Sequence, residues 1–291
     1  MSIAVIITDR NTDALCQHLR QVLPEVQIQQ WPELPNPEAV KLAVLWKHPV
    51  GITQSFSQLK SVLSMGAGMD HIESDDSIGN DLLTGRIVTP ALQQNMAQYV
   101  LLYILLNHRH HQTYLYQQQQ HIWKVLENDV LPTIGFLGLG KLGCYVADQC
   151  KALGFATVAW TQTQNHPVHE CFHGESGLKQ VCERSDFLVV LLPLNSDTKQ
   201  IINRKILGWC HPGCTLIHVG RGHHVHEQDL LAALNSGEIK QAVLDVFNEE
   251  PLPPEHPFWS HPKITITPHS SSRSDVKQTA EQITLYYKNI A

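Results

Sequence analysis

Short apolar runs rich in β-branched residues recur through the first part of the chain. They lie at residues 3–8, 26–31, 42–46 and 61–65, and each has the length and composition of a buried strand. Residues 12–23 instead carry their apolar side chains on one helical stripe. Strands that alternate with helices predict a parallel sheet with helices on both of its faces.

A second alternating unit begins near residue 133, after a helical stretch over residues 91–125 that follows Pro90, a residue tolerated at a helix start. The polar, His- and Gln-rich end of this stretch indicates a solvated helix face, and the alternative is packing against the same helix of a second copy. In the second unit we expect strands at 133–137, 156–160, 187–192, 215–219, 242–246 and 264–267, and helices at 141–153, 198–207, 227–234 and 274–290.

These patterns predict an α/β protein with two doubly wound parallel-sheet domains. Residues 1–90 with 274–291 should form one flavodoxin-like domain, and residues 91–273 a Rossmann domain inserted into it. A length of 291 residues fits this division, since domains average roughly 150 residues. If the helix at 91–125 pairs with its twin, the protein is a homodimer.

Composition and charge narrow the classes of protein that fit. Hydrophobic residues make up 43% of the chain, which excludes disorder as the main state. The net charge of −6 argues against a nucleic-acid partner, and no apolar run is long enough to span a membrane. Residues 1–8 lack a basic region and predict a strand, not a signal peptide. The 7 cysteines include no CxxC, so we expect reduced thiols in the cytoplasm.

The segment GLGKLG at residues 138–143 matches the pattern GxGxxG. It directly follows an expected strand and opens an expected helix, which is the context of dinucleotide binding. The first glycine permits a tight turn, the second a close approach of the pyrophosphate, and the third close packing of helix on strand. The alternative is a tight turn without a ligand. We expect the cofactor phosphates at the following residues: Gly138, Leu139, Gly140, Lys141, Leu142 and Gly143.

The next strand decides which nicotinamide cofactor is favoured. It ends at Trp160 with no Asp or Glu, the residues that bind the free ribose hydroxyls of NAD(H). It also offers no arginine for a 2′-phosphate, and Thr161, Gln162 and Gln164 are able to hydrogen-bond either cofactor. The missing carboxylate favours NADP(H) over NAD(H), and NAD(H) is left open.

Three ionisable residues follow expected strands of the second unit: Arg221, Glu250 and His269. Ligands of doubly wound sheets bind beyond the carboxyl ends of the strands, so all three are candidates for one catalytic site. A ketone that accepts hydride needs a proton donor with a pKa near neutrality, which histidine provides. A carboxylate beside it favours the imidazolium, and arginine binds a substrate carboxylate with two hydrogen bonds.

With these residues the chain resembles the D-isomer-specific 2-hydroxyacid dehydrogenases, and within them the branch of glyoxylate/hydroxypyruvate reductases A. The resemblance covers nearly the whole chain. Its most specific segments are 66–70 (GAGMD), 138–143 (GLGKLG), 221–231 (RGHHVHEQDLL), 244–254 (LDVFNEEPLPP) and 264–269 (ITITPH).

The resemblance implies a role for each member of the trio. Arg221 would bind the substrate carboxylate and keto oxygen, His269 would donate the proton in reduction, and Glu250 would hold and tune His269. Glu249 is its neighbour without that role, since the family's glutamate immediately precedes the proline. The expected reaction is NAD(P)H-dependent reduction of glyoxylate, hydroxypyruvate or another small 2-oxo acid.

Further binding residues follow from the resemblance. The backbone N–H groups of Ala67 and Gly68 would take the substrate carboxylate, as expected for a glycine-rich turn after a strand, and Trp46 ends a strand from which it would reach the substrate. The remaining cofactor residues are Asp245 for the nicotinamide carboxamide, Pro193 for the adenine side, and Val219.

Three departures from the family pattern concern the pockets and the chain end. Gln98 stands where relatives often have an acid, residues 270–272 are Ser-Ser-Ser where small apolar residues are usual, and the chain stops at Ala291 without a closing extension. The first two are the positions at which the substrate or cofactor pocket is expected to differ, and the third should matter little for chemistry.

Other functions and sites carry less weight. A dinucleotide-sensing protein, like the corepressor on this fold, would share the trio but needs a partner-binding tail that is not visible; a methyltransferase would leave the trio unexplained. The histidines and cysteine at 166–173 fall in an expected loop without a second ligand framework, so no metal site is expected. His223 and His224 are interpreted as satisfied or solvated, with a cofactor contact of either one as the alternative, and Cys210 and Cys214 lack redox spacing.

Overall fold

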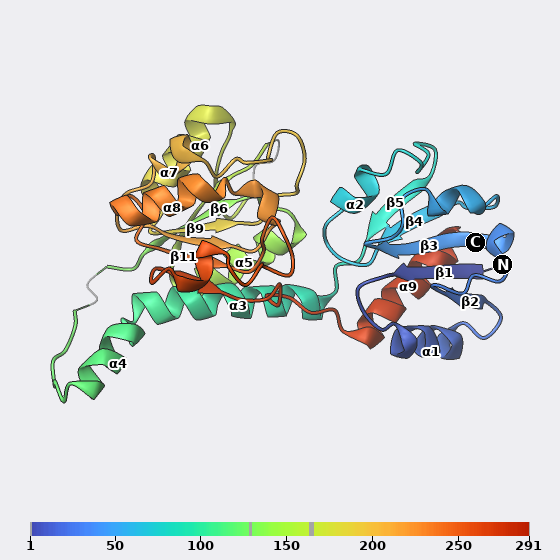
Figure 1. Ribbon diagram of the computed structural model, residues 1–291, viewed down its shortest axis with the longest axis horizontal. Helices are drawn as coiled ribbons and strands as arrows, with labels where there is room; N and C mark the ends of the chain where they lie inside the picture. The colour runs from blue at the N-terminus through green and yellow to red at the C-terminus, as the bar shows by residue number, and fades with distance from the viewer. Residues whose placement is uncertain (1, 128–129, 163–165, 291) are drawn as a thin grey trace. The chain divides into compact units, whose positions relative to one another are not determined.

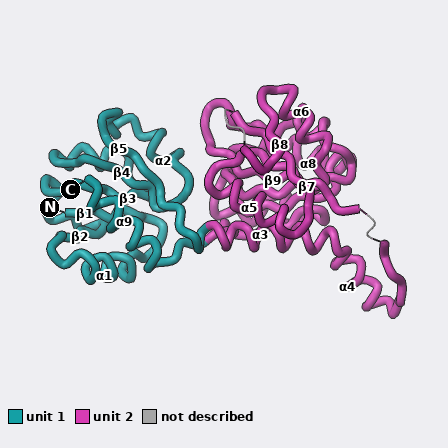
Figure 2. Tube along the Cα trace, turned by 180° about the vertical axis from the view of Figure 1, so that it is seen from behind, with its two compact units in different colours: residues 1–92, 273–291 teal, residues 93–272 magenta. Residues whose placement is uncertain are grey.

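A computed structural model describes residues 2–127, 130–162 and 166–290 (Figure 1). The chain divides into two compact units, Met1–Leu92 with Arg273–Ala291 and Gln93–Ser272 (Figure 2). Each unit is built on its own parallel sheet, so the predicted α/β class with two doubly wound domains is confirmed.

The first unit has the strand order β2-β1-β3-β4-β5, which is that of flavodoxin-like folds. Side chains of β1 alternate between the faces of the sheet: Ile3 and Val5 pack with α1 and α9, whereas Ala4 and Ile6 pack with α2. The elements are β1 (Ser2–Ile7), α1 (Asp13–Val22), β2 (Gln27–Gln30), β3 (Val40–Trp46), β4 (Ser61–Ser64), α2 (Asp70–Glu73), β5 (Leu83–Arg86) and α9 (Val276–Ile290).

The C-terminal helix α9 returns to the first unit and is tied there by two glutamines. The Gln282 amide accepts from the N–H of Val88 at 3.1 Å and donates to its carbonyl oxygen at 2.8 Å. The Gln278 side chain accepts from the N–H of Ala91 at 3.0 Å. These contacts anchor the start of α3 (Pro90–His108) to the first unit.

The second unit has the order β12-β11-β10-β9-β6-β7-β8, a Rossmann arrangement with β6 at the point where the strand order reverses. Helices α3 and α5 pack on one face, and α6 and α8 on the other. Its strands are β6 (Thr133–Leu137), β7 (Ala156–Trp160), β8 (Glu170–Phe172), β9 (Phe187–Val190), β10 (Thr215–His218), β11 (Gln241–Leu244) and β12 (Ile264–Ile266). Its further helices are α4 (His111–Gln119), α5 (Lys141–Ala152), α6 (Gly174–Arg184), α7 (Arg204–Leu207) and α8 (Glu227–Ser236).

The single long helix predicted at 91–125 is wrong. Helix α3 ends at His108, His110 has a left-handed φ of 53°, and α4 ends at Gln119. The last fully buried side chain of α3 is Ile104, so beyond it no core favours continuing the same helix. The segment that follows α4 is not helical.

Two further expectations need correction. Of the helix predicted at 198–207, only α7 forms, because Gln200 has a positive φ of 53° and the Asn203 side chain accepts from two N–H groups of α7, which begins the helix there. The loop expected at 166–173 contains β8, which pairs in parallel with β7. Strands β8 and β5 are too short and too mixed in composition to form an apolar run, so the pattern did not predict them.

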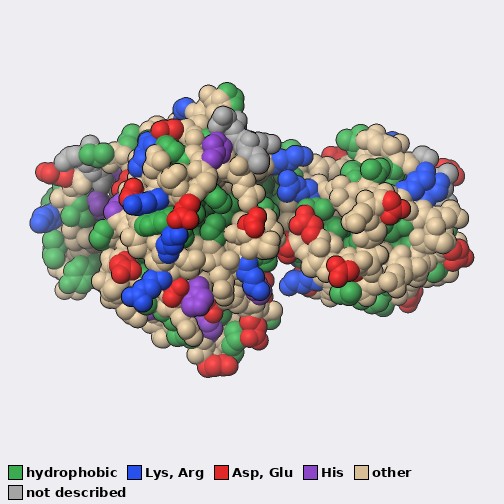
Figure 3. Space-filling view, turned by 90° about the horizontal axis from the view of Figure 1, so that it is seen from above, with side chains coloured by type: hydrophobic (Ala, Val, Ile, Leu, Met, Phe, Trp, Pro, Cys, Tyr) green, Lys and Arg blue, Asp and Glu red, His purple; other side chains and the backbone are tan. Residues whose placement is uncertain are grey.

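Surface charge and helix hydropathy add two observations. Acidic and basic side chains are interspersed on the face that Figure 3 shows. None of the helices in the described part of the chain combines the length and the apolar character needed to cross a membrane.

Candidate active site

The glycine turn joins β6 to α5, and its three glycines have three different surroundings. Gly138 has a φ of +98°, and a Cβ there would lie 2.8 Å from the Leu191 carbonyl oxygen. A Cβ on Gly143 would lie 2.3 Å from the Gly138 oxygen, whereas a Cβ on Gly140 would meet no atom within 4 Å. Space is therefore open only at Gly140, and the residues present fit a pyrophosphate against the N-terminus of α5.

The residues after β7 are partly used within the fold. The N–H of Thr161 donates to the Phe172 carbonyl oxygen at 3.0 Å, and the Thr161 hydroxyl lies 3.3 Å from His173 Nδ1. Thr161 is buried and Gln162 is exposed. The predicted contacts of both with the cofactor stay predictions, and Gln164 lies outside the described residues.

Pro193 and Val219 lie at the carboxyl ends of β9 and β10. The Pro193 carbonyl oxygen accepts from the Thr198 hydroxyl at 2.6 Å and from His224 Nε2 at 3.2 Å. The N–H of Val219 donates to the Val190 carbonyl oxygen at 3.3 Å, and its side chain is buried. These bonds set the backbone of both loops, and the predicted cofactor contacts of Pro193 and Val219 stay predictions.

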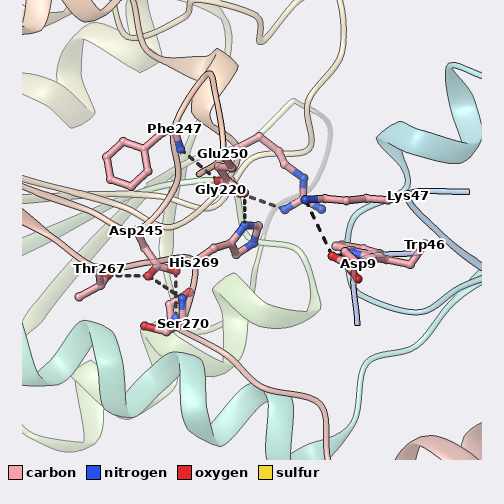
Figure 4. A network of polar contacts seen from close by, with 12 residues as sticks. Asp9, Trp46, Lys47, Gly220, Asp245, Phe247, Glu250, Thr267, His269 and Ser270 are labelled. Carbon is pink, nitrogen blue, oxygen red and sulfur yellow. Dashed lines mark hydrogen bonds and ion pairs between the residues drawn. The ribbon is translucent and has the colours of Figure 1, made fainter. Parts of the chain in front are cut away.

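The trio Arg221, Glu250 and His269 follows three strands that are neighbours in the sheet, β10, β11 and β12. His269 Nδ1 lies 2.9 Å from Glu250 Oε2, and Figure 4 shows the imidazole directed at that carboxylate. The other oxygen, Glu250 Oε1, accepts from the N–H of Phe247 at 3.2 Å. The carboxylate therefore holds Nδ1, and Nε2 is left as the nitrogen that can exchange a proton with a ligand.

The loop that carries Arg221 is packed against the loop that carries Glu250. A Cβ on Gly222 would lie 1.9 Å from the backbone carbon of Phe247, the residue whose N–H binds Glu250. Only glycine permits this approach, so the sequence Arg221-Gly222 sets the spacing of the two loops.

Asp245 is fully buried and holds the turn that presents His269. Its Oδ1 accepts from the Thr267 hydroxyl at 2.5 Å and from the N–H of Ser270 at 2.8 Å. Its Oδ2 accepts from the N–H of Ser271 at 2.9 Å, and His269, with a φ of 48°, donates its N–H to the Asp245 carbonyl oxygen. Asp245 thus fixes the catalytic histidine, and its predicted contact with a nicotinamide carboxamide stays a prediction.

Sequence reasoning missed two residues of this network, Thr267 and Tyr99. The Tyr99 hydroxyl lies 2.6 Å from Thr267 Oγ1; burial raises the pKa of Tyr99, and so does the nearby charge of Asp245. Because Thr267 donates to Asp245, Tyr99 must donate to Thr267. The only local signal for Thr267 was its place two residues before His269, and none pointed to Tyr99 on α3.

The first unit presents its own candidate binding turn at the carboxyl ends of β3 and β4. The Trp46 ring lies against Gly66, where a Cβ would come within 2.9 Å of it, and its Nε1 donates to Asp9 at 3.1 Å. Within residues 2–127, no hydrogen bond involves the N–H of Ala67 or of Gly68. Two adjacent N–H groups of this kind can bind an anion.

The histidines near β8 are structural. His169 is buried, with Nε2 3.0 Å from Asp148 Oδ1 and Nδ1 2.8 Å from the Thr157 hydroxyl. Burial lowers its pKa. In the part of the chain that the structure describes, no cluster of His, Cys, Asp or Glu has the arrangement of a metal site.

Comparison with known proteins places this geometry among enzymes of one family. A family model described as D-isomer specific 2-hydroxyacid dehydrogenase, NAD binding domain, matches residues 101–271. Glyoxylate/hydroxypyruvate reductase A of Yersinia enterocolitica is 35% identical over an alignment of 260 residues that covers 86% of this chain and 82% of that protein.

Two solved structures are similar over nearly their full length. A D-isomer specific 2-hydroxyacid dehydrogenase from Xanthobacter autotrophicus, in complex with NADPH and MES, has a TM-score of 0.93 and 30% identity and covers 99% of this chain and 94% of that one. An NADPH-dependent glyoxylate/hydroxypyruvate reductase from Sinorhizobium meliloti, in complex with NADP and sulfate, has a TM-score of 0.88 and 29% identity and covers 100% and 96%.

Proposed function

The chain belongs to the D-isomer specific 2-hydroxyacid dehydrogenase family, and from this premise we propose that it reduces glyoxylate and hydroxypyruvate with NADPH. Membership confirms the resemblance inferred from the sequence and makes the protein an oxidoreductase that uses a nicotinamide cofactor. The observation that supports the proposed reaction is the His269–Glu250 pair, 2.9 Å apart, at the carboxyl edge of the sheet that carries the glycine turn.

The pair is suited to deliver one proton to a keto oxygen. The Glu250 carboxylate accepts from Nδ1 of His269 and orients the ring, so that a proton on Nε2 can pass to the oxygen as negative charge develops there. A nicotinamide cofactor held at residues 138–143 would supply the hydride. The 2-oxo acid gains one hydride and one proton, and His269 returns to its neutral form.

Arg221 and the turn of the first unit are assigned to the substrate carboxylate. The Arg221 guanidinium can bind a carboxylate and the developing alkoxide, and two adjacent N–H groups such as those of Ala67 and Gly68 can bind a carboxylate. Trp46, packed on Gly66, would limit the size of the substrate side chain. Residues 1–90 with 274–291 then serve the substrate, and residues 91–273 serve the cofactor.

NADPH is preferred to NADH in this proposal. The strand that precedes Thr161 and Gln162 ends without a carboxylate, so nothing there repels a 2′-phosphate. The related enzymes from Xanthobacter and Sinorhizobium were found with NADPH and NADP. The cofactor would lie along residues 138–143 and reach Pro193, Val219 and Asp245.

The protein is further proposed to act as a cytoplasmic homodimer through residues 91–125. Helix α4 and the segment after it expose apolar side chains, among them Tyr116 of the helix at 59% and Trp123 of the segment at 100%. A groove of about 500 Å³ lies beside them, lined by Tyr114 and Ile122 among others. A second copy of this segment would cover both the groove and the exposed tryptophan.

The deciding experiment follows NADPH and NADH absorbance with glyoxylate and with hydroxypyruvate, for the wild type and for His269→Ala. We expect turnover that requires His269 and is faster with NADPH. Tight NADPH binding without turnover on either substrate would favour the dinucleotide-sensing alternative, and preference for NADH would overturn the interpretation of Thr161 and Gln162.

A further inference from the structure

Two buried histidines hold the backbone of Arg221 from both sides. His218 is the last residue of β10, and His224 closes a short 3-10 helix over Gly222–His224. Their exposed fractions are 1% and 0%, and their rings stack edge to face at 5.6 Å. Neither side chain belongs to the chemistry proposed above.

The bonds engage both peptide groups that flank the Arg221 Cα. His218 Nε2 donates to the Arg221 carbonyl oxygen at 2.8 Å, and the N–H of His224 donates to the same oxygen at 3.0 Å. The Arg221 N–H donates to His224 Nδ1 at 3.1 Å, and His224 Nε2 donates to the Pro193 carbonyl oxygen at 3.2 Å. The N–H and the carbonyl oxygen of Arg221 are thus both hydrogen-bonded, so rotation of either flanking peptide would break a bond.

These partners determine the tautomer of each ring. A carbonyl oxygen only accepts, so both rings must carry their hydrogen on Nε2. Nδ1 of His224 must be bare to accept from Arg221, and a proton there would face the Arg221 N–H. Burial lowers the pKa of His218 to about 3, and the neighbouring His224 adds to this effect. We call His218 and His224, with their bonds to the Arg221 backbone, the clamp. Both of its imidazoles are therefore neutral.

The neighbouring glycines show how tightly the clamp is closed. A Cβ on Gly220 would lie 2.9 Å from His224 Nδ1, and a Cβ on Gly222 would overlap the Phe247 backbone. Between them Arg221 has an extended conformation with φ −135° and ψ 142°. A residue whose two flanking peptides are both held has a fixed Cα–Cβ direction, which narrows the positions that its side chain can reach.

We propose that His218 and His224 are positioning residues that aim the Arg221 guanidinium at the substrate carboxylate. This inference rests on the proposed function, in which Arg221 binds the substrate carboxylate. Loss of a hydrogen bond between these imidazoles and the Arg221 backbone should weaken substrate binding more than cofactor binding. The reason is that the imidazoles bind the loop of Arg221 and not the glycine turn at 138–143.

A matched pair of variants separates positioning from general stability. Asn places its Oδ1 where His places Nδ1, whereas Gln places its terminal atoms where His places Nε2. His224→Asn therefore keeps the acceptor for the Arg221 N–H and loses the bond to Pro193, and His224→Gln does the reverse. Both remove the same ring, so a merely structural role predicts equal effects.

The first readout is the split between KM and cofactor binding. We expect His224→Gln to raise KM for glyoxylate about five- to tenfold, the cost of one buried hydrogen bond, with NADPH Kd within about twofold of the wild type. His224→Asn should raise KM by a clearly smaller factor, because it keeps the acceptor for the Arg221 N–H. An equal rise of KM in both variants overturns the proposal.

A second readout does not need turnover. Hydrogen exchange of the Arg221 amide should be slow in the wild type and in His224→Asn, and fast in His224→Gln, and ¹⁵N spectra should show both rings as neutral Nε2–H tautomers. If the wild type fails to reduce glyoxylate, the proposed function is wrong. The exchange comparison still tests whether His218 and His224 hold the Arg221 backbone. Fast exchange in the wild type, or a proton on Nδ1 of His224, would contradict the proposal.

Discussion

At the scale of single residues, the adjacent glutamates Glu249 and Glu250 have different roles because their contacts differ. Glu250 accepts from His269 and from the N–H of Phe247, whereas Glu249 is exposed. Sequence reasoning separated the two only by the family pattern before Pro251. The geometry supplies the physical reason, because only Glu250 reaches the imidazole.

We expect Glu250→Gln to lower kcat about 10- to 100-fold, because the variant replaces the carboxylate that holds Nδ1 of the proton-donating His269 with a neutral amide. Steady-state rates with glyoxylate and NADPH measure this effect. Glu249→Gln is the matched control and should retain nearly full activity. Comparable losses in both variants would show that the Glu250–His269 contact does not matter for proton transfer.

His218 makes a prediction about stability at low pH. Its pKa of about 3 in the folded protein lies below the value of 6.5 for an unperturbed histidine. As the pH falls below about 6.5, the unfolded chain therefore binds a proton that the native state cannot bind. The free energy of unfolding should drop by about 1 kcal/mol per pH unit from this group alone.

His218→Gln keeps a donor for the Arg221 carbonyl oxygen but does not titrate. Urea unfolding at several pH values between about 4.5 and 7.5 should give a shallower decline for this variant than for the wild type. His111→Gln, at an exposed position of α4, is the control and should leave the slope unchanged. Identical slopes in all three proteins would refute the assignment to His218.

At the scale of elements, two glycines of the turn between β6 and α5 are expected to serve different ends: Gly143 the stability of the fold, and Gly140 the binding of the cofactor. Gly143→Ala forces a Cβ against the Gly138 carbonyl oxygen and should destabilise the fold by about 1–3 kcal/mol, as overpacking does. Gly140→Ala places its methyl in open space and should leave the free energy of unfolding nearly unchanged. It should instead raise the NADPH Kd by about tenfold or more, which is at least about 1.4 kcal/mol.

Urea unfolding and a fluorescence titration with NADPH measure the two quantities in each variant. The comparison tests the assignment of the cofactor phosphates directly, since both variants change a glycine of one turn. Unchanged NADPH affinity in Gly140→Ala would place the pyrophosphate elsewhere.

Elements were predictable from the sequence where a local pattern and the core agree. The runs that became β1, β9 and β10 are buried on both faces of their sheets, so an apolar run was sufficient. The helix at 91–125 failed because a helical pattern does not reveal where the core beneath it ends. In the site, the motif residues were found from chain order, whereas Tyr99, Thr267 and the roles of His218 and His224 depend on contacts that only folding creates.

At the scale of the whole molecule, the segment that follows α4 has apolar side chains that the described chain does not cover. Trp123 is 100% exposed, and burying a side chain of this size stabilises an interface by a few kcal/mol. From the sequence, packing against a second copy was the alternative to a solvated helix face, and the exposed Trp123 favours that alternative. The proposed homodimer thus depends on Trp123 more than on the helical part of residues 91–125.

Trp123→Ser should shift the protein from dimer to monomer at micromolar concentration, because removal of a central interface tryptophan costs about 2 kcal/mol or more. Sedimentation equilibrium measures the change in association constant. Trp259→Ser is the matched control: Trp259 is 53% exposed and lies outside this segment, so its loss should leave the association unchanged. A wild-type protein that stays monomeric, or a Trp123→Ser variant that dimerises as well as the wild type, would remove residues 91–125 as the interface. The fold of the monomer should survive either substitution, because both side chains face solvent.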